Sequence, residues 1–166
     1  MPTPYNYYFN KNSQFYYLTT KNNIEYRVAF IIDETFSAVS GLEINNIFQI
    51  VIEKVTDGLE RLDVQVSATI QTIIAAFFIN SQNSMIYVCD DRDKKGIKGI
   101  KRFNVFNKWY EKSGLYYIKK KDNIIHCYSN NEILIIHSSL FYHKNNKNKA
   151  TIIEVYNTIQ EILNEK

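Results

Sequence analysis

Residues 85–114, MIYVCDDRDKKGIKGIKRFNVFNKWYEKSG, decide the fold of this chain. The stretch opens with an apolar run that predicts a strand over Ser84–Asp90, and the run is continuous enough for a strand covered on both faces. An acidic turn follows, and then a basic helix that is expected to end at Lys112, because Gly114 is a natural C-terminal stop. The segment therefore predicts a buried strand that leads through a turn into a surface helix.

The helix is expected to begin between Lys95 and Ile100. Its apolar side chains recur at helical spacing and predict the buried side: Ile100, Phe103, Phe106, Trp109 and Tyr110. Its lysines are expected on the other side: Lys101, Lys108 and Lys112. This pattern is typical of a helix that packs on one face of a sheet.

The strand before this helix also completes a strand–helix–strand unit. Residues 47–55, IFQIVIEKV, predict a strand, and Val64–Asn80 predicts a long apolar helix with Asp63 as its N-cap. Two strands joined by one crossover helix are expected to be parallel neighbours. The sequence therefore predicts one parallel βαβ unit at the centre of the chain.

The flanking segments predict antiparallel strands. Three are expected before the unit, over residues 5–9, 14–20 and 24–33, followed by a connector over residues 34–46. Three more are expected after it, over residues 115–121, 124–129 and 132–139, with a tight turn at Asn130-Asn131. Thr151 and Glu154 form a capping box that predicts the start of the last helix.

This order predicts an α+β fold with a mixed, mainly antiparallel sheet and a C-terminal helix over about residues 150–165. At 166 residues the chain is long enough for a single domain over residues 1–166 with a sizeable core.

Composition restricts the possible functions. The net charge of +3 and the isoelectric point near 8.7 are mildly basic, so nucleic-acid binding is not expected. The longest apolar run, Ile73–Ile79, is too short to span a membrane, and the N-terminus lacks the pattern of a signal peptide. Cys89 and Cys127 are far apart in apolar runs, which indicates free thiols in a reducing, cytoplasmic compartment.

The segment FNKWYEKSGL, residues 106–115, resembles a motif of the Gcn5-related N-acyltransferases, and the element order over residues 14–139 resembles their core. The resemblance implies an acyl-CoA N-acyltransferase-like fold with acetyl-CoA or another acyl-CoA as cofactor. It implies that Tyr110 protonates the departing coenzyme A thiolate and that Ile47–Val55 binds the pantetheine. The backbone amides of Val66, Ser67 and Ala68 would then hold the pyrophosphate at a helix N-terminus.

The chain departs from that family's pattern where the phosphates would bind. The corresponding residues, 61–68, contain no glycine, and Asp63 places a negative charge beside the expected phosphates. We therefore expect a degenerate, non-catalytic binding or regulatory module of the toxin–antitoxin or phage-defence type. Its contact would be a protein partner or a second copy, through the C-terminal helix or the open edge of the N-terminal sheet. The alternative is an acyl-CoA-dependent N-acyltransferase with Tyr110 as general acid.

Two further motifs resemble a family of small bacterial proteins of unknown function. They are D-x-x-V-x-x-T-I-x-x-I over Asp63–Ile73 and Y-x-C-D-x-x-D over Tyr87–Asp93, with Arg102 and Trp109 following. This resemblance spans most of the chain and implies no activity.

Other groups were considered as sites and have simpler interpretations. Asp90, Asp91 and Asp93 could hold Mg²⁺ in a nuclease, but they also suit a solvated turn that Arg102 fixes. His126 and His137 are expected as diagonal neighbours on a hairpin, too few for a zinc site. The aromatic residues of the first strands could stack on bases, but their high β-propensity explains them as well.

Overall fold

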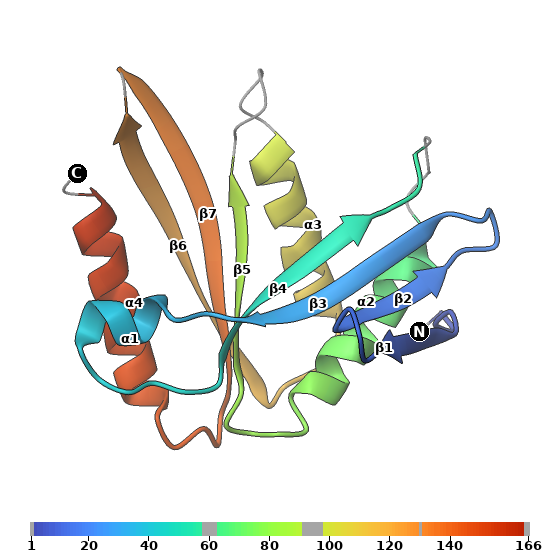
Figure 1. Ribbon diagram of the computed structural model, residues 1–166, viewed down its shortest axis with the longest axis horizontal. Coiled ribbons are helices and arrows are strands. Elements are labelled where there is room, and N and C mark those ends of the chain that lie inside the picture. The colour runs from blue at the N-terminus through green and yellow to red at the C-terminus, as the bar shows by residue number, and fades with distance from the viewer. Residues whose placement is uncertain (1, 58–62, 91–97, 130, 165–166) are drawn as a thin grey trace.

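The strands that the structure describes form one seven-stranded sheet, in the order β1-β2-β3-β4-β5-β7-β6 (Figure 1). The computed structural model describes residues 2–57, 63–90, 98–129 and 131–164. The strands are β1 Tyr7–Asn10, β2 Phe15–Thr19, β3 Glu25–Ile32, β4 Ile47–Lys54, β5 Ser84–Asp90, β6 Ile118–Ser129 and β7 Glu132–His143. The helices are α1 Thr35–Ser40, α2 Val64–Phe77, α3 Lys98–Lys112 and α4 Lys149–Asn164.

The sheet is mixed and mainly antiparallel, as the sequence predicts. The neighbouring pair β4–β5 is parallel, and the other described pairs are antiparallel. Helix α2 connects the parallel pair, which confirms the predicted strand–helix–strand unit. The α+β class and the C-terminal helix are therefore confirmed.

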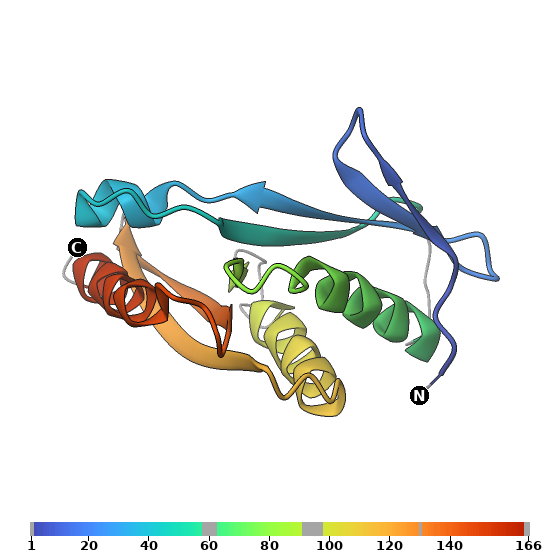
Figure 2. The same cartoon turned by 90° about the horizontal axis from the view of Figure 1, so that it is seen from below.

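Helices cover both faces of the central strands (Figure 2). One core lies under α2 and α3: Val28, Ile50, Val66, Ile70, Met85, Phe106 and Phe141 are among its buried residues. A second core lies under α1 and α4: Phe36, Ile47, Ile86, Leu140, Ile152 and Tyr156 are among its residues. Met85 and Ile86 belong to different cores because successive strand residues point to opposite faces. Strand β5 is thus covered on both faces, as its continuous apolar run predicts.

Strands β4 and β5 stay together over a short length. They pair through Ile47–Gln49 and Ser84–Ile86 and then diverge toward their carboxyl ends (Figure 1). Helices α2 and α3 lie side by side on one face of the sheet, next to the place where the two strands diverge. Helix α3 packs on β5 and β7, on the β5 side of this divergence.

The C-terminal strands differ from the three-stranded meander that the sequence predicts. Residues 118–129 form one continuous strand that pairs with β7 along its whole length. Asp122 and Asn123 fall between two of the predicted strands, but in the structure they lie opposite Ser139 and Ser138. Ser139 Oγ donates a hydrogen bond of 2.6 Å to Asp122 Oδ1, so a polar cross-strand partner keeps this position in the ladder. Asn131 has φ 64° in the two-residue turn, while Asn130 lies outside the described residues.

The helices differ from the sequence-based expectations in three places. The expected connector contains α1, which buries Phe36 against Tyr156 of α4. Helix α2 ends at Phe77, three residues early, where Asn83 Nδ2 donates to the Phe77 carbonyl at 2.8 Å. The capping box at Thr151 is wrong, because α4 begins at Lys149 and the Ile152 amide already bonds to the Asn148 carbonyl.

None of the helices in the described part of the chain has the length and apolar character that crossing a bilayer requires.

Candidate functional site

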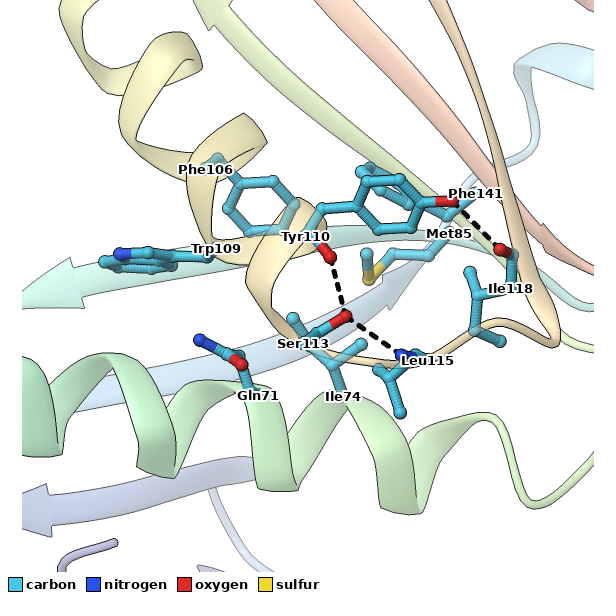
Figure 3. A pocket seen from close by; sticks show the side chains of 10 residues that line it. All are labelled: Gln71, Ile74, Met85, Phe106, Trp109, Tyr110, Ser113, Leu115, Ile118 and Phe141. Carbon is cyan, nitrogen blue, oxygen red and sulfur yellow. Dashed lines mark hydrogen bonds between the residues drawn. The ribbon is translucent and has the colours of Figure 1, made fainter. Parts of the chain in front are cut away.

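A small apolar pocket lies between the inner surface of α3 and the sheet, next to the point where β4 and β5 diverge (Figure 3). Its lining comes from both helices, from the loop after α3 and from the strands: Gln71, Ile74, Met85, Phe106, Trp109, Tyr110, Ser113, Leu115, Ile118 and Phe141. The free volume is about 20 Å³, close to the room that one water molecule needs. Side chains therefore fill most of the space between α3 and the sheet at this point.

Tyr110 lies in this pocket, as α3's apolar spacing predicts. Its hydroxyl donates a hydrogen bond of 2.9 Å to the Ile118 carbonyl, and its ring meets Phe141 edge-on (Figure 3). Burial, with a smaller contribution from Tyr142 and Asp122, raises the pKa of the Tyr110 hydroxyl above its ordinary value. The group therefore keeps its proton at neutral pH and directs it at the backbone.

The turn after α3 fixes the position of Tyr110. Ser113 Oγ donates to the Tyr110 carbonyl at 2.7 Å and accepts from the Leu115 amide at 3.2 Å (Figure 3). Gly114 adopts φ 67°, the left-handed conformation that ends the helix as predicted. These local bonds turn the chain back toward β6. The carbonyl of its first residue, Ile118, accepts the hydrogen bond from the Tyr110 hydroxyl.

The N-terminus of α2 is capped within the chain. Asp63 Oδ1 accepts a hydrogen bond of 2.8 Å from the Gln65 amide, which confirms Asp63 as the N-cap. Its other oxygen, Oδ2, accepts one of 2.7 Å from the Tyr5 hydroxyl. The Tyr5 amide in turn donates to Thr69 Oγ1 at 2.8 Å. The segment before β1 therefore lies along the first turns of α2, and a carboxylate already occupies the helix end.

The three residues predicted to hold a pyrophosphate are all buried, but they face different surroundings. Val66 belongs to the core under α2, whereas Ser67 and Ala68 line a surface groove between α2 and α3. We call this the α2–α3 groove. It has a volume of about 500 Å³ and is lined by Pro2, Val64, Ser67, Ala68, Gln71, Val105, Lys108, Trp109 and Lys112. Two of the predicted residues therefore lie on a cavity wall.

The groove and the pocket of Tyr110 are neighbours. Gln71 and Trp109 line both, and Figure 3 shows their side chains at the same end of the pocket, away from Ile118. Gln71 Nε2 donates to Ser67 Oγ at 2.9 Å, and Gln71 Oε1 is a buried atom with no hydrogen-bond partner in the described part of the chain. The predicted site residues thus lie on the same side of the sheet.

The α3 wall gives the groove its charge. Lys108 and Lys112 are exposed, and neither forms an ion pair with the residues that the structure describes. The sequence placed these lysines on the side of α3 opposite Trp109, yet Lys108, Trp109 and Lys112 line one groove. The signal was present in the i, i+3, i+4, i+7 spacing of Val105, Lys108, Trp109 and Lys112. It could not be interpreted without the position of α2.

A comparison with protein families matches residues 62–158 to DUF6169, a family of unknown function. The chain belongs to the DUF6169 family. A search of curated proteins and a search of solved structures each return no significant match. The DUF6169 region covers α2, β5, α3, β6, β7 and most of α4, so it contains every residue that lines the groove except Pro2. Strands β1–β4 lie outside it.

The acidic cluster of this DUF6169 chain is described in part. Arg102 Nη2 donates to the backbone carbonyl of Asp90 at 3.2 Å, which ties the start of α3 to the end of β5. Asp91 and Asp93 lie outside the described residues. Within the described ranges, no three His, Cys, Asp or Glu side chains come close enough together to hold a metal ion.

The remaining polar candidates of the DUF6169 chain are separate from the groove. His137 is buried opposite Ile124, and His126 is exposed opposite Ile135, so the two histidines are diagonal neighbours as predicted. Glu53 forms an ion pair with Arg27 across β3 and β4.

Proposed function

We propose that this DUF6169 protein is a non-catalytic binding or regulatory module that works through a protein partner, of the toxin–antitoxin or phage-defence type. One observation carries the proposal. The general acid that an acyltransferase of the resembling family would direct at its cofactor is bonded inside the chain, and a carboxylate lies at the helix end where the pyrophosphate would bind. Tyr110 donates to the Ile118 carbonyl, and the Asp63 carboxylate caps α2.

The position of Tyr110 supports a structural role. A general acid must lie within about 3 Å of the atom that receives its proton. The Tyr110 hydroxyl has its acceptor 2.9 Å away in the backbone, and about 20 Å³ of free space adjoins it. A thiolate would have to displace both the carbonyl and the packed side chains. Tyr110 therefore serves to join α3 to β6.

The charge at α2 supports the same conclusion. A pyrophosphate binds a helix end through free amides and the positive end of the helix dipole. Here the Asp63 carboxylate takes the Gln65 amide and contributes a negative charge of its own. The bond from the Tyr5 hydroxyl holds this carboxylate in place. An incoming phosphate would meet repulsion at the point where the resemblance requires attraction.

The alternative function is an acyl-CoA-dependent N-acyltransferase. The divergence of β4 from β5 favours this alternative, since the resembling family binds acyl-CoA in such a gap, and Met85 of β5 lines the pocket that contains Tyr110. Acetyl-CoA or another acyl-CoA would then be held by the amides of Val66, Ser67 and Ala68, with Tyr110 as the general acid. The N-acyltransferase-like core would extend over residues 14–139.

Two assays distinguish the non-catalytic module from the N-acyltransferase. One measures binding of acetyl-CoA, and the other measures hydrolysis of acetyl-CoA or transfer of its acetyl group. We expect no heat of binding in calorimetry with millimolar acetyl-CoA, and no release of free thiol with a panel of amines. Tyr110→Phe tests the acid, and Tyr116→Phe is the matched control because Tyr116 is 85% exposed on the following turn. Thiol release that Tyr110→Phe abolishes, with an unchanged melting temperature and with Tyr116→Phe active, would refute the non-catalytic function.

A bacterial, cytoplasmic origin completes the proposal. Cys89 and Cys127 are both free thiols, which suits a reducing compartment. The partner could also be a second copy of this chain. Light scattering of the purified protein distinguishes a homodimer from a monomer that binds a different protein.

A further inference from the structure

The α2–α3 groove has the shape of a peptide-binding site. Its walls are two helices, and its length is set by Val64–Gln71 on one side and Val105–Lys112 on the other. Seven residues of helix rise about 10 Å, which is the length of about three residues of extended chain. A groove of about 500 Å³ lies within the size range of functional binding sites in proteins.

Charge and polarity differ between the two walls. On the α3 wall, Lys108 and Lys112 are one helical turn apart and neither is paired within the described residues. On the α2 wall, Val64 is 58% exposed and presents apolar surface beside the buried Ala68, and Ser67 and Gln71 are uncharged. None of the described residues that line the groove is acidic, and Glu111 of the neighbouring turn does not line it. The groove therefore attracts an anionic ligand that also carries apolar surface.

We propose that the α2–α3 groove binds a short acidic segment of a partner protein, with an acid–apolar–acid pattern in extended conformation. The inference rests on the proposed protein-binding function and names its surface and its partner class. Residues i and i+2 of an extended chain lie on the same side, about 6.6 Å apart. Side chains i and i+4 of a helix have their Cβ atoms about 5–6 Å apart. Two acidic side chains at i and i+2 thus match Lys108 and Lys112, while the apolar residue between them faces Val64 and Ala68.

Two residues at the inner end of the groove support a peptide. Trp109 offers a large, partly buried aromatic surface, the residue type that most often dominates protein interfaces. Gln71 Oε1 is a buried acceptor that has no partner in the described part of the chain. A peptide backbone supplies N–H donors that can satisfy this oxygen once the side chain turns toward the groove.

The experiment uses the chain's own fluorescence. Trp109 is the single tryptophan of the sequence and lines the groove, so its emission responds to a ligand that binds there. The probe is a capped peptide, Gly-Ser-Gly-Glu-Leu-Glu-Gly-Ser-Gly, titrated into the full chain at up to 5 mM. Two control peptides replace the central three residues with Lys-Leu-Lys and with Glu-Ser-Glu. We expect a saturable spectral shift with the Glu-Leu-Glu peptide, a weaker response with Glu-Ser-Glu and none with Lys-Leu-Lys.

Charge-reversal variants locate the binding. The double variant Lys108→Glu with Lys112→Glu is expected to weaken the Glu-Leu-Glu peptide by about tenfold, because two attractions become repulsions. Lys101→Glu is the matched control, since Lys101 is an exposed lysine of the same helix outside the groove, and it should change the affinity less than about twofold. Circular dichroism checks that each variant is folded.

Four results would overturn the inference. The first three are no shift with the Glu-Leu-Glu peptide, equal binding of the Lys-Leu-Lys peptide, and equal weakening by Lys101→Glu and by the double variant. A fourth is a shift with coenzyme A, used as a small-anion probe, that displaces the peptide, because the groove would then be a small-molecule site. The thiol-release assay tests the non-catalytic function independently of these outcomes. The peptide-binding inference and the proposed function can therefore fail separately.

Discussion

Replacing Asp63 with alanine removes two hydrogen bonds at the start of α2. The side chain accepts from the Gln65 amide and from the Tyr5 hydroxyl, at 2.8 and 2.7 Å. Loss of an N-cap costs about 1 kcal/mol. A hydrogen bond to a charged group contributes about 1.5 kcal/mol or more when it is buried, and the partial exposure of both residues reduces this contribution to about 1 kcal/mol. We therefore expect Asp63→Ala to lower the free energy of unfolding by about 2 kcal/mol.

A double-mutant cycle separates the two bonds. Tyr5→Phe removes the hydroxyl and leaves the cap, so it should cost about 1 kcal/mol. Combining it with Asp63→Ala should reveal a coupling free energy of about 1 kcal/mol between the two side chains. Asp63→Asn is the conservative control, because asparagine caps helices as well as aspartate does, and it should cost less than about 1 kcal/mol. Urea unfolding followed by circular dichroism measures all four variants.

The result bears on function as well as on stability. If the carboxylate lay beside an empty phosphate site and did not cap the helix, its removal would leave the free energy of unfolding unchanged or would raise it. A change within about 0.5 kcal/mol for Asp63→Ala, or no coupling to Tyr5, would refute the reasoning that the chain caps its own helix. A large loss supports the view that the end of α2 is already satisfied.

Three further outcomes follow from the packing. Phe106→Ala should cost about 3–5 kcal/mol in urea unfolding, because Phe106 is 3% exposed and stacks on Tyr87 at 3.9 Å between ring centres. Gly114→Ala should cost about 1 kcal/mol by the same measurement, since an added Cβ meets nothing within 4 Å but φ is 67°. Stability should fall as the pH rises above about 10, because burial raises the pKa of Tyr87 and Tyr156 above their ordinary value of 10.0. The unfolded chain then releases protons that the folded chain retains. Tyr156→Phe should reduce this dependence in unfolding titrations between pH 8 and 11.

The sequence predicted the parts of the fold that local pattern determines. The bounds of β5 match because an apolar run ended by an acidic residue is unambiguous, and α2 begins at its predicted N-cap. Strand β6 could not be predicted as one strand, because Asp122 and Asn123 look like a turn until their cross-strand serines are known. Helix α1 was missed for a similar reason. It is six residues long, and the burial of Phe36 against Tyr156, far along the chain, accounts for its position.

The candidate site was predictable on one wall. Spacing alone brought Tyr110 to the inner side of α3, and the N-cap pattern located the first turn of α2. The role of Lys108 and Lys112 depends on where α2 lies relative to α3, which no spacing within one helix can give. Lys101, Lys108 and Lys112 are exposed, as predicted, and the charge of the groove comes from the two that lie on the side of α3 next to α2.

The small side chains of α2 connect the two functions that were weighed. The resemblance assigned Ser67 and Ala68 to the pyrophosphate because they lie near the N-terminus of α2, and the same two residues line the hollow where α2 faces α3. Electrostatics then decides where an anion can lie in this hollow. Near the N-terminus of α2 it meets the fixed carboxylate of Asp63, and along α3 it meets two unpaired ammonium groups of the described chain. An acidic ligand is therefore expected along the α3 wall, and the charge of Lys108 and Lys112, rather than the helix dipole of α2, should control its affinity.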